Sequence, residues 1–165
     1  MGWQTTFHPF SFKPSWQGIE NLAWEEQLAK LKDPEFKARM VAEESDYPDS
    51  DIRFLAEIAT TAWGMLYEMG DGFNYEPTPE ETLEAGAART GVSAAEYAYD
   101  VLMRDEGTGF IYFPVLNYAD GNLDFLEALQ RADDCVNSLS DGGAHCGTIC
   151  DAASPTFMLE YWVRD

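Results

Sequence analysis

Basic residues are scarce in this chain. Ten lysines and arginines stand against 30 aspartates and glutamates, which gives a formal charge of −20. Binding to nucleic acid or to an anionic membrane depends on clustered lysine and arginine, so the composition argues against both partners. The same imbalance predicts self-repulsion, high solubility and a need for salt or counter-ions.

Long apolar segments and cysteines are also lacking. No apolar run approaches the roughly 18 residues of a membrane span, and the first residues lack the charged and apolar regions of a secretory signal. Three cysteines are an odd number, so the sequence implies no self-contained disulfide framework and favours reduced thiols. We therefore expect a soluble, cytoplasmic protein.

The length sets a further limit on the fold. The 165 residues suffice for one domain with a reasonable core. A complete (β/α)8 barrel takes about 250 residues, and roughly 200 at the least. The chain is therefore too short for that fold in full, and any barrel that it contributes to has to be partial.

Helix boundaries are well marked. Four runs place a capping side chain before a proline or an acidic residue, as at a helix N-terminus. They are Asp33-Pro34, Thr78-Pro79-Glu80-Glu81, Ser93-Ala94-Ala95-Glu96 and Ser154-Pro155. Gly91 is expected to end the second of these helices, and the third is expected to run to about Met103. Leu123, Leu126 and Leu129 recur at helical spacing and predict one more helix.

Two segments are expected to be loops. Residues 1–18 are rich in aromatic residues, proline and glycine. Residues 43–51 are acidic and turn-rich, with Tyr47-Pro48-Asp49 at their centre. His8 precedes Pro9 in the first loop, and we expect it on the surface.

Two short runs predict β-strands. They are residues 110–115, in which Pro114 indicates an early end or a bulge, and residues 136–139. The order strand, helix, strand, helix is that of a βαβ unit with parallel strands. Two short parallel strands do not form a stable sheet alone, because parallel sheets are covered on both faces and widened by further strands. The pattern predicts an α/β fold, mostly helical with two or so parallel strands, that is a segment of a larger barrel.

The most informative run, Leu139 to Asp151, follows the second strand. Asp141 leaves the carboxyl end of that strand into two glycines, and His145 comes four residues later. Carboxylates in this place are typical of α/β active sites. The spacing alone leaves other interpretations open: Asp141 is also a common residue for a turn, and His145 is equally explained as a loop histidine bonded to backbone.

A further interpretation joins His145 to Cys146 and Cys150 in a small zinc module. Zinc takes four ligands in structural sites and three protein ligands in catalytic sites. Three residues separate the two cysteines, and no fourth soft ligand is evident. The cysteines are more simply explained as small packing residues.

Several segments resemble the N-acyl-D-amino-acid deacylases, which are metal-dependent C–N hydrolases of the amidohydrolase superfamily. The run around Asp141 is the most specific of them. The others are His8-Pro9-Phe10, Asp33-Pro34, Asn74-Tyr75-Glu76-Pro77-Thr78, Tyr99-Asp100, Phe113-Pro114, Asn117-Tyr118-Ala119-Asp120-Gly121, Thr156-Phe157 and Trp162-Val163-Arg164-Asp165. The resemblance covers nearly the whole chain and implies the C-terminal part of the catalytic (β/α)8 barrel.

The resemblance also implies a function. It implies hydrolysis of the amide bond of N-acyl-D-amino acids or related N-acyl compounds, with a divalent metal, zinc, as cofactor. Asp141 is implied as the acid/base residue and as a metal ligand, and His145 as a substrate-binding residue. Within a partial catalytic domain of residues 1–165, residues 19–72 are implied as a helical and loop insertion and residues 73–165 as the last βα units.

The chain lacks much of what the family has. The family's early His-x-His pair, bridging metal ligand and two later histidines have no counterpart, since His8 and His145 are the only histidines. The flanking β-sandwich is absent too, and Tyr161 stands where a histidine is often found. We therefore expect the metal to be held mainly by residues of a missing N-terminal half, and the isolated chain to be inactive. The alternative is a non-catalytic acidic remnant that self-associates or binds a partner through exposed sheet edges.

Overall fold

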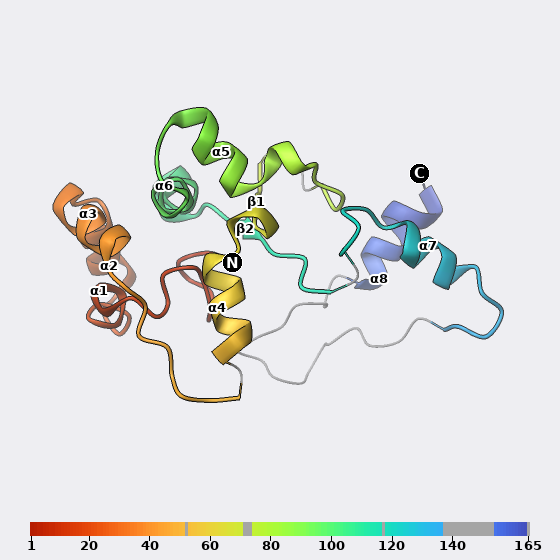
Figure 1. The fold of residues 1–165 in the computed structure, drawn as a ribbon, viewed down its shortest axis with the longest axis horizontal. Helices are drawn as coiled ribbons and strands as arrows, with labels where there is room; N and C mark the ends of the chain where they lie inside the picture. Colours follow the sequence, from red (N-terminus) through yellow and green to blue (C-terminus); the bar gives the residue numbers. More distant parts are fainter. Residues whose placement is uncertain (52, 71–73, 117, 137–153, 165) are drawn as a thin grey trace. The chain divides into compact units, whose positions relative to one another are not determined.

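The computed structural model describes residues 1–51, 53–70, 74–116, 118–136 and 154–164 (Figure 1). The chain divides into two compact units, Met1–Asn122 and Leu123–Asp165. Helices dominate the described part of both units.

The first unit consists of short helices and one two-stranded ribbon. In chain order its elements are α1 (Pro14–Gln17), α2 (Trp24–Leu31), α3 (Pro34–Ala42), α4 (Arg53–Thr61), the 3-10 turn η1 (Trp63–Met65), β1 (Tyr67–Glu68), the 3-10 turn η2 (Pro79–Glu81), α5 (Leu83–Thr90), α6 (Ala94–Gly107) and β2 (Ile111–Tyr112).

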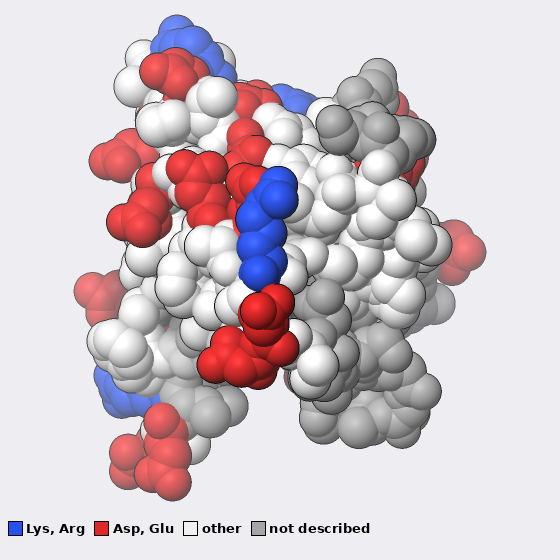
Figure 2. Space-filling view, turned by 90° about the vertical axis from the view of Figure 1, so that its right-hand side faces the viewer, with Lys and Arg blue, Asp and Glu red and all other residues white. Residues whose placement is uncertain are grey.

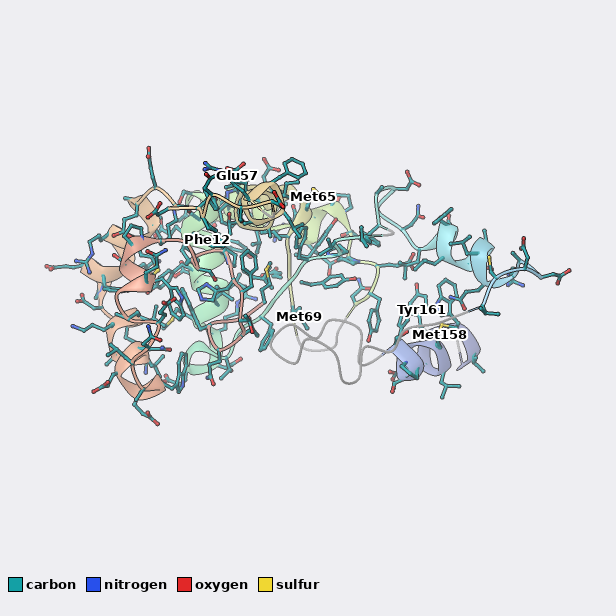
Figure 3. All side chains as sticks on the ribbon, turned by 90° about the horizontal axis from the view of Figure 1, so that it is seen from below. Phe12, Glu57, Met65, Met69, Met158 and Tyr161 are labelled. Atoms are coloured by element: carbon teal, nitrogen blue, oxygen red, sulfur yellow. The ribbon has the colours of Figure 1, made fainter. Side chains whose placement is uncertain are left out.

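The second unit holds α7 (Asp124–Gln130), α8 (Ser154–Phe157) and the π-helical segment η3 (Met158–Arg164). The helices expected from the leucine spacing and from Ser154-Pro155 are thus confirmed. Tyr161, labelled in Figure 3, stacks on Phe157 with ring centroids 5.1 Å apart. This contact joins α8 to η3.

The helix boundary signals are confirmed in the first unit. The Asp33 carboxylate accepts a hydrogen bond from the backbone N–H of Glu35 (2.9 Å) at the start of α3. The Ser93 hydroxyl accepts one from the N–H of Glu96 (3.1 Å) at the start of α6. Gly91 ends α5 in the left-handed conformation, at φ 75°.

The capping box at Thr78 opens a shorter element than the sequence predicts. The backbone N–H of Thr78 donates to the Glu81 carboxylate (2.7 Å), yet η2 ends at Glu81 and Thr82 caps a new helix, α5. The backbone N–H of Leu83 donates to the carbonyl of Leu66 (2.8 Å), which draws the chain toward β1 and interrupts the helix.

Residues 1–13 contain turns but no helix or strand, as expected of a loop, yet Trp3 and Phe10 lie in the core together with Trp16 of α1. The Trp3 ring stacks on Phe10 (centroids 5.4 Å apart) and on Trp16 of α1 (5.3 Å). His8 is only 1% exposed, which overturns its expected surface position. The physical reason is that each large aromatic ring removes a large apolar area from water, and this segment carries several of them without helical or strand periodicity.

The remaining core is supplied by the helices and by β2. The cluster consists of Trp3, Phe10, Trp16, Ile19, Leu31, Phe36, Met40, Leu66, Leu83, Ala98, Tyr99, Val101, Leu102 and Ile111. Tyr99 of α6 contacts Trp3 edge-on, and its hydroxyl donates a hydrogen bond to the carbonyl of Leu31 (2.7 Å). That bond satisfies a backbone acceptor at the end of α2.

Residues 43–51 contain no helix or strand, as expected, but they are anchored to the core segment. Phe12, labelled in Figure 3, lies with its ring centroid 5.2 Å from that of Tyr47. The N–H of Asp46 donates to the carbonyl of Phe12 (2.7 Å), and the hydroxyls of Tyr47 and Thr60 lie 2.6 Å apart.

The β-ribbon is antiparallel. Tyr67 of β1 pairs with Tyr112 of β2, and Glu68 with Ile111. On its other side β2 meets Met1, since the nitrogen of Met1 donates to the carbonyl of Ile111 (2.6 Å) and the N–H of Ile111 donates back to Met1 (2.8 Å). The strand expected over residues 110–115 thus forms only at Ile111–Tyr112 and ends before Pro114. Residues 137–139 lie outside the described residues, so parallel pairing with a second strand, and the barrel itself, stay predictions.

The end of α6 carries unusual backbone strain. Asp105 (φ 47°), Glu106 (φ 60°) and Gly107 (φ 82°) are all left-handed, a conformation that costs a non-glycine residue about 1–2 kcal/mol. Gly107 faces Trp24 and Leu28 of α2, where an added Cβ would lie 3.1 Å from both side chains. Close packing against α2 therefore imposes the turn.

We expect Glu106→Gly to raise the free energy of unfolding by about 0.5–1 kcal/mol, because relief of the strain exceeds the added entropy of the unfolded chain. Urea denaturation measures the change. Glu106→Ala is the matched control, since it also removes the exposed ion pair with Lys32 but keeps a Cβ on the left-handed backbone. Equal stability of the two variants would contradict the assignment of backbone strain to Glu106.

Candidate functional site

The two residues predicted from the sequence as a catalytic site, Asp141 and His145, lie outside the described residues, as do Cys146 and Cys150. Their roles stay predictions. The described cysteine, Cys135, is exposed and has a free thiol. What the structure does describe is the surroundings of two other segments, residues 74–78 and 118–121, which follow β1 and β2.

These two segments meet at Tyr118. Its hydroxyl donates a hydrogen bond to the carbonyl of Pro77 (2.9 Å), across 41 residues of sequence. Asn74 shapes the same loop, because its side-chain oxygen accepts from the N–H of Glu76 (3.0 Å) and its amide donates to the Glu76 carbonyl (3.1 Å). The loop after β1 and the loop after β2 are therefore held together.

Tyrosine rings line this junction. The buried Tyr118 ring meets Tyr67 of β1 edge-on, with centroids 6.2 Å apart, and Tyr67 in turn faces Tyr112 of β2 at 6.4 Å. We call Tyr67, Tyr112 and Tyr118 the tyrosine cluster. It places aromatic side chains at the end of the ribbon formed by β1 and β2.

The phenols of the tyrosine cluster are poor bases and poor acids. Burial, together with neighbouring phenols and the Glu76 and Glu81 carboxylates, raises the pKa of Tyr118 to about 12. Burial likewise raises the pKa of Tyr67 and the pKa of Tyr112 above the usual value. At neutral pH all three phenols are hence neutral, and Tyr118 serves as a hydrogen-bond donor to Pro77.

We expect Tyr118→Phe to lower the free energy of unfolding by about 0.5–1.5 kcal/mol at pH 7, because the Pro77 carbonyl loses its donor. The wild-type protein should also lose stability as the pH rises from 10 to 12. The sign follows from the raised pKa of Tyr118, because the folded state keeps a proton that the unfolded state releases. Denaturation at pH 8 and pH 11 measures both effects, and Tyr118→Phe should reduce the alkaline loss to the part contributed by the other tyrosines with a raised pKa. An unchanged alkaline loss in this variant would contradict the assignment.

A second polar cluster was not predicted from the sequence. The Glu68 carboxylate accepts hydrogen bonds from the Tyr97 hydroxyl (2.9 Å) and from the Arg104 guanidinium (2.6 Å), with Arg89 at 3.9 Å. Gly86 makes room for it, since a Cβ there would lie 2.1 Å from the Tyr97 ring. These contacts connect β1 to α5 and α6. Because the Glu68 carboxylate is already paired with Tyr97 and two arginines, we assign it a structural role.

The ligand chemistry of the described residues is limited. Among them, no three His, Cys, Asp or Glu side chains gather closely enough to hold a metal ion. Asp141, the predicted ligand, is not among them. Also within the described part of the chain, no helix has the length and apolar character needed to cross a membrane.

No protein-family model matches the chain, and neither a curated protein nor a solved structure is significantly similar to it.

Proposed function

We propose that the chain is the C-terminal part of the catalytic domain of an amidohydrolase that acts on N-acyl-D-amino acids or related N-acyl compounds. The run Leu139 to Asp151 carries the proposal, because it joins a carboxylate at a predicted strand end to two glycines and a histidine. The contact of Tyr118 with Pro77 supports it, since this bond holds together two further segments of the family's pattern.

Asp141 is the acid/base residue in this proposal. A water molecule attacks the amide carbonyl carbon, and the Asp141 carboxylate accepts a proton from that water. As the C–N bond breaks, Asp141 passes the proton to the leaving nitrogen, and a carboxylic acid and the free amino acid result. His145 binds the substrate. A divalent metal, zinc by resemblance, would polarise the carbonyl oxygen, and it would be held mainly by residues outside this chain.

The charge of the chain bears on its partners. The face drawn in Figure 2 carries more acidic than basic side chains, in line with the formal charge of −20. Such a surface disfavours nucleic acid and anionic membranes. A small N-acyl amino acid is the partner proposed, and a cationic group of the missing N-terminal half would have to bind its carboxylate.

Reconstitution tests the proposal. The chain is co-expressed with a complementary half that supplies the β-sandwich and the early His-x-His strand of a family deacylase, and zinc is added. We expect release of free amine from N-acetyl-D-methionine, a preference over the L-isomer, and no activity from the isolated chain. A folded complex without activity would overturn the proposed reaction, and an active isolated chain would overturn the partial domain.

The second candidate function is that of a non-catalytic acidic module that self-associates. Phe54 and Leu55 of α4 favour it, since they are 73% and 49% exposed, and Met65 of η1 is exposed as well. The exposed sheet edges expected for self-association are partly covered within the chain. Met1 bonds to β2 at Ile111, and Thr82 bridges to Tyr67 on the other side of β1. A helical oligomer of defined size that survives a chelator supports this function, and a monomer at all concentrations contradicts it.

A further inference from the structure

His8 is a buried ionisable group that the proposed chemistry does not use. Its ring meets Trp16 at right angles, with centroids 4.3 Å apart, and lies 4.9 Å from the Trp3 ring. Phe10 stacks on the same Trp3 ring. The imidazole is thus enclosed by aromatic side chains, an environment that penalises a charged form.

The hydrogen bonding of His8 defines its protonation state. Its Nδ1 accepts a hydrogen bond from the backbone N–H of Phe10 (3.2 Å). An accepting Nδ1 carries no proton, so the neutral ring bears its proton on Nε2. Protonation of Nδ1 would abolish this bond and place a charge among the rings. The fold therefore accommodates only the neutral imidazole.

The described groups around His8 offer a positive charge no anionic partner. The segment that holds it contributes Trp3, Phe10 and the Ser11 hydroxyl, which accepts from the His8 N–H (2.9 Å). From α1 comes Trp16, and behind Trp3 lies Tyr99 of α6, whose phenol is neutral at physiological pH. Among the described residues, the one charge found to act on His8 is the amino group of Met1, which also opposes protonation.

We propose that His8 is an acid-sensitive latch: its neutral ring holds residues 1–12 in the core of the first unit, and its protonation releases them. Release would also break the pairing of Met1 with Ile111, and β2 leads directly into the loop of Tyr118. Acid would thus loosen the ribbon on which the tyrosine cluster is built.

The expected size of the effect follows from linkage. Burial, and then the Met1 amino group, lowers the pKa of His8 from 6.5 to about 3 in the folded chain. The unfolded state therefore binds a proton between these values that the folded state excludes, so stability is complete above pH 6.5 and falls as the pH drops toward 3. The contribution of His8 to the folding equilibrium constant should decrease about 100-fold between pH 7 and pH 4.5.

This direction is opposite to that expected from the net charge. Protonation of carboxylates in a chain of charge −20 relieves self-repulsion and should stabilise the compact state on mild acidification. The two contributions can hence be separated by a variant that removes only the titrating ring.

The test measures urea denaturation of the full chain at pH 7, 5.5 and 4.5 for the wild type, His8→Asn and His145→Asn. Asparagine at position 8 keeps a side-chain acceptor near the Phe10 N–H but does not titrate. We expect the ratio of the wild-type equilibrium constant to that of His8→Asn to fall about 100-fold over this range, while His145→Asn follows the wild type. Parallel pH profiles of the wild type and His8→Asn, or the absence of a cooperative transition at pH 7, would overturn the proposal.

A second measurement applies if His8→Asn does not fold. The imidazole resonances of the two histidines are followed in the wild-type chain by NMR as the pH is lowered. One of them should stay neutral, with its proton on Nε2, down to the pH at which the first unit opens. Titration of both rings near pH 6.5 in the folded chain would overturn the proposal.

Discussion

Gly109→Ala should lower the free energy of unfolding by more than about 3 kcal/mol, among the larger effects of a single methyl group. A Cβ at Gly109 would lie 1.9 Å from the carbonyl oxygen of Val101 and 3.0 Å from its carbonyl carbon. Both are backbone atoms of α6, which is packed into the core through Val101 and Leu102. Neither can move without displacing the helix, so the chain leading into β2 has to shift instead.

The matched control for this variant is Gly70→Ala. A Cβ at Gly70 has no heavy atom within 4 Å, and the residue does not need a left-handed backbone. Alanine there should raise the free energy of unfolding by about 0.4–1 kcal/mol, because it restricts the unfolded chain. Urea denaturation of both variants provides the comparison. Similar stability of Gly109→Ala and Gly70→Ala would show that the end of α6 packs differently.

Asp141→Asn should lower kcat of the reconstituted amidohydrolase by about 10²–10⁴-fold. An asparagine amide has nearly the same shape as the carboxylate, but it cannot accept a proton from water and pass it to the leaving nitrogen. Because the shape is kept, we expect the complex to assemble as before. The measurement is release of free amine from N-acetyl-D-methionine, with kcat and KM determined separately.

Asp120→Asn is the control for this second prediction. Asp120 is an exposed residue in the loop of Tyr118, so the substitution removes the same charge from the chain at a place without an assigned role. We expect its kcat to equal that of the wild type. Equal losses in both variants would mean that the net charge, rather than a specific carboxylate, controls the activity, and the role assigned to Asp141 would be wrong.

Local signals in the sequence predicted the starts of α3 and α6 and the end of α5, but they did not predict α1, α2 or α4. Asp33, Ser93 and Gly91 act on backbone groups within four residues of themselves, so the information needed to place them is contiguous. At Thr78 the predicted capping box forms, but the bond from Leu83 to Leu66 limits the element that it opens to one 3-10 turn. Tertiary contacts of this kind leave no trace in a local pattern.

The predicted site and the core also differ in how far apart their residues lie in the sequence. The run around Asp141 is contiguous and could be found by inspection. By contrast, Trp3 meets Tyr99, and Glu68 meets Arg104, across long stretches of chain. Residues 1–18 have no helical or strand periodicity, so their composition predicted only a loop. Their aromatic rings are buried through contacts with Tyr99 of α6, which lies far away in the sequence.

The pairing of Met1 with Ile111 has a consequence for synthesis. This contact joins residues 110 positions apart, so a chain emerging from the ribosome cannot complete the first unit until β2 has been made. During that interval Trp3, Phe10 and Trp16 lack partners from α6, and their apolar surface is open to chaperones or to aggregation. Contacts of such long range also slow folding. Residues 1–18 therefore reach their final place only after β2 has been synthesised.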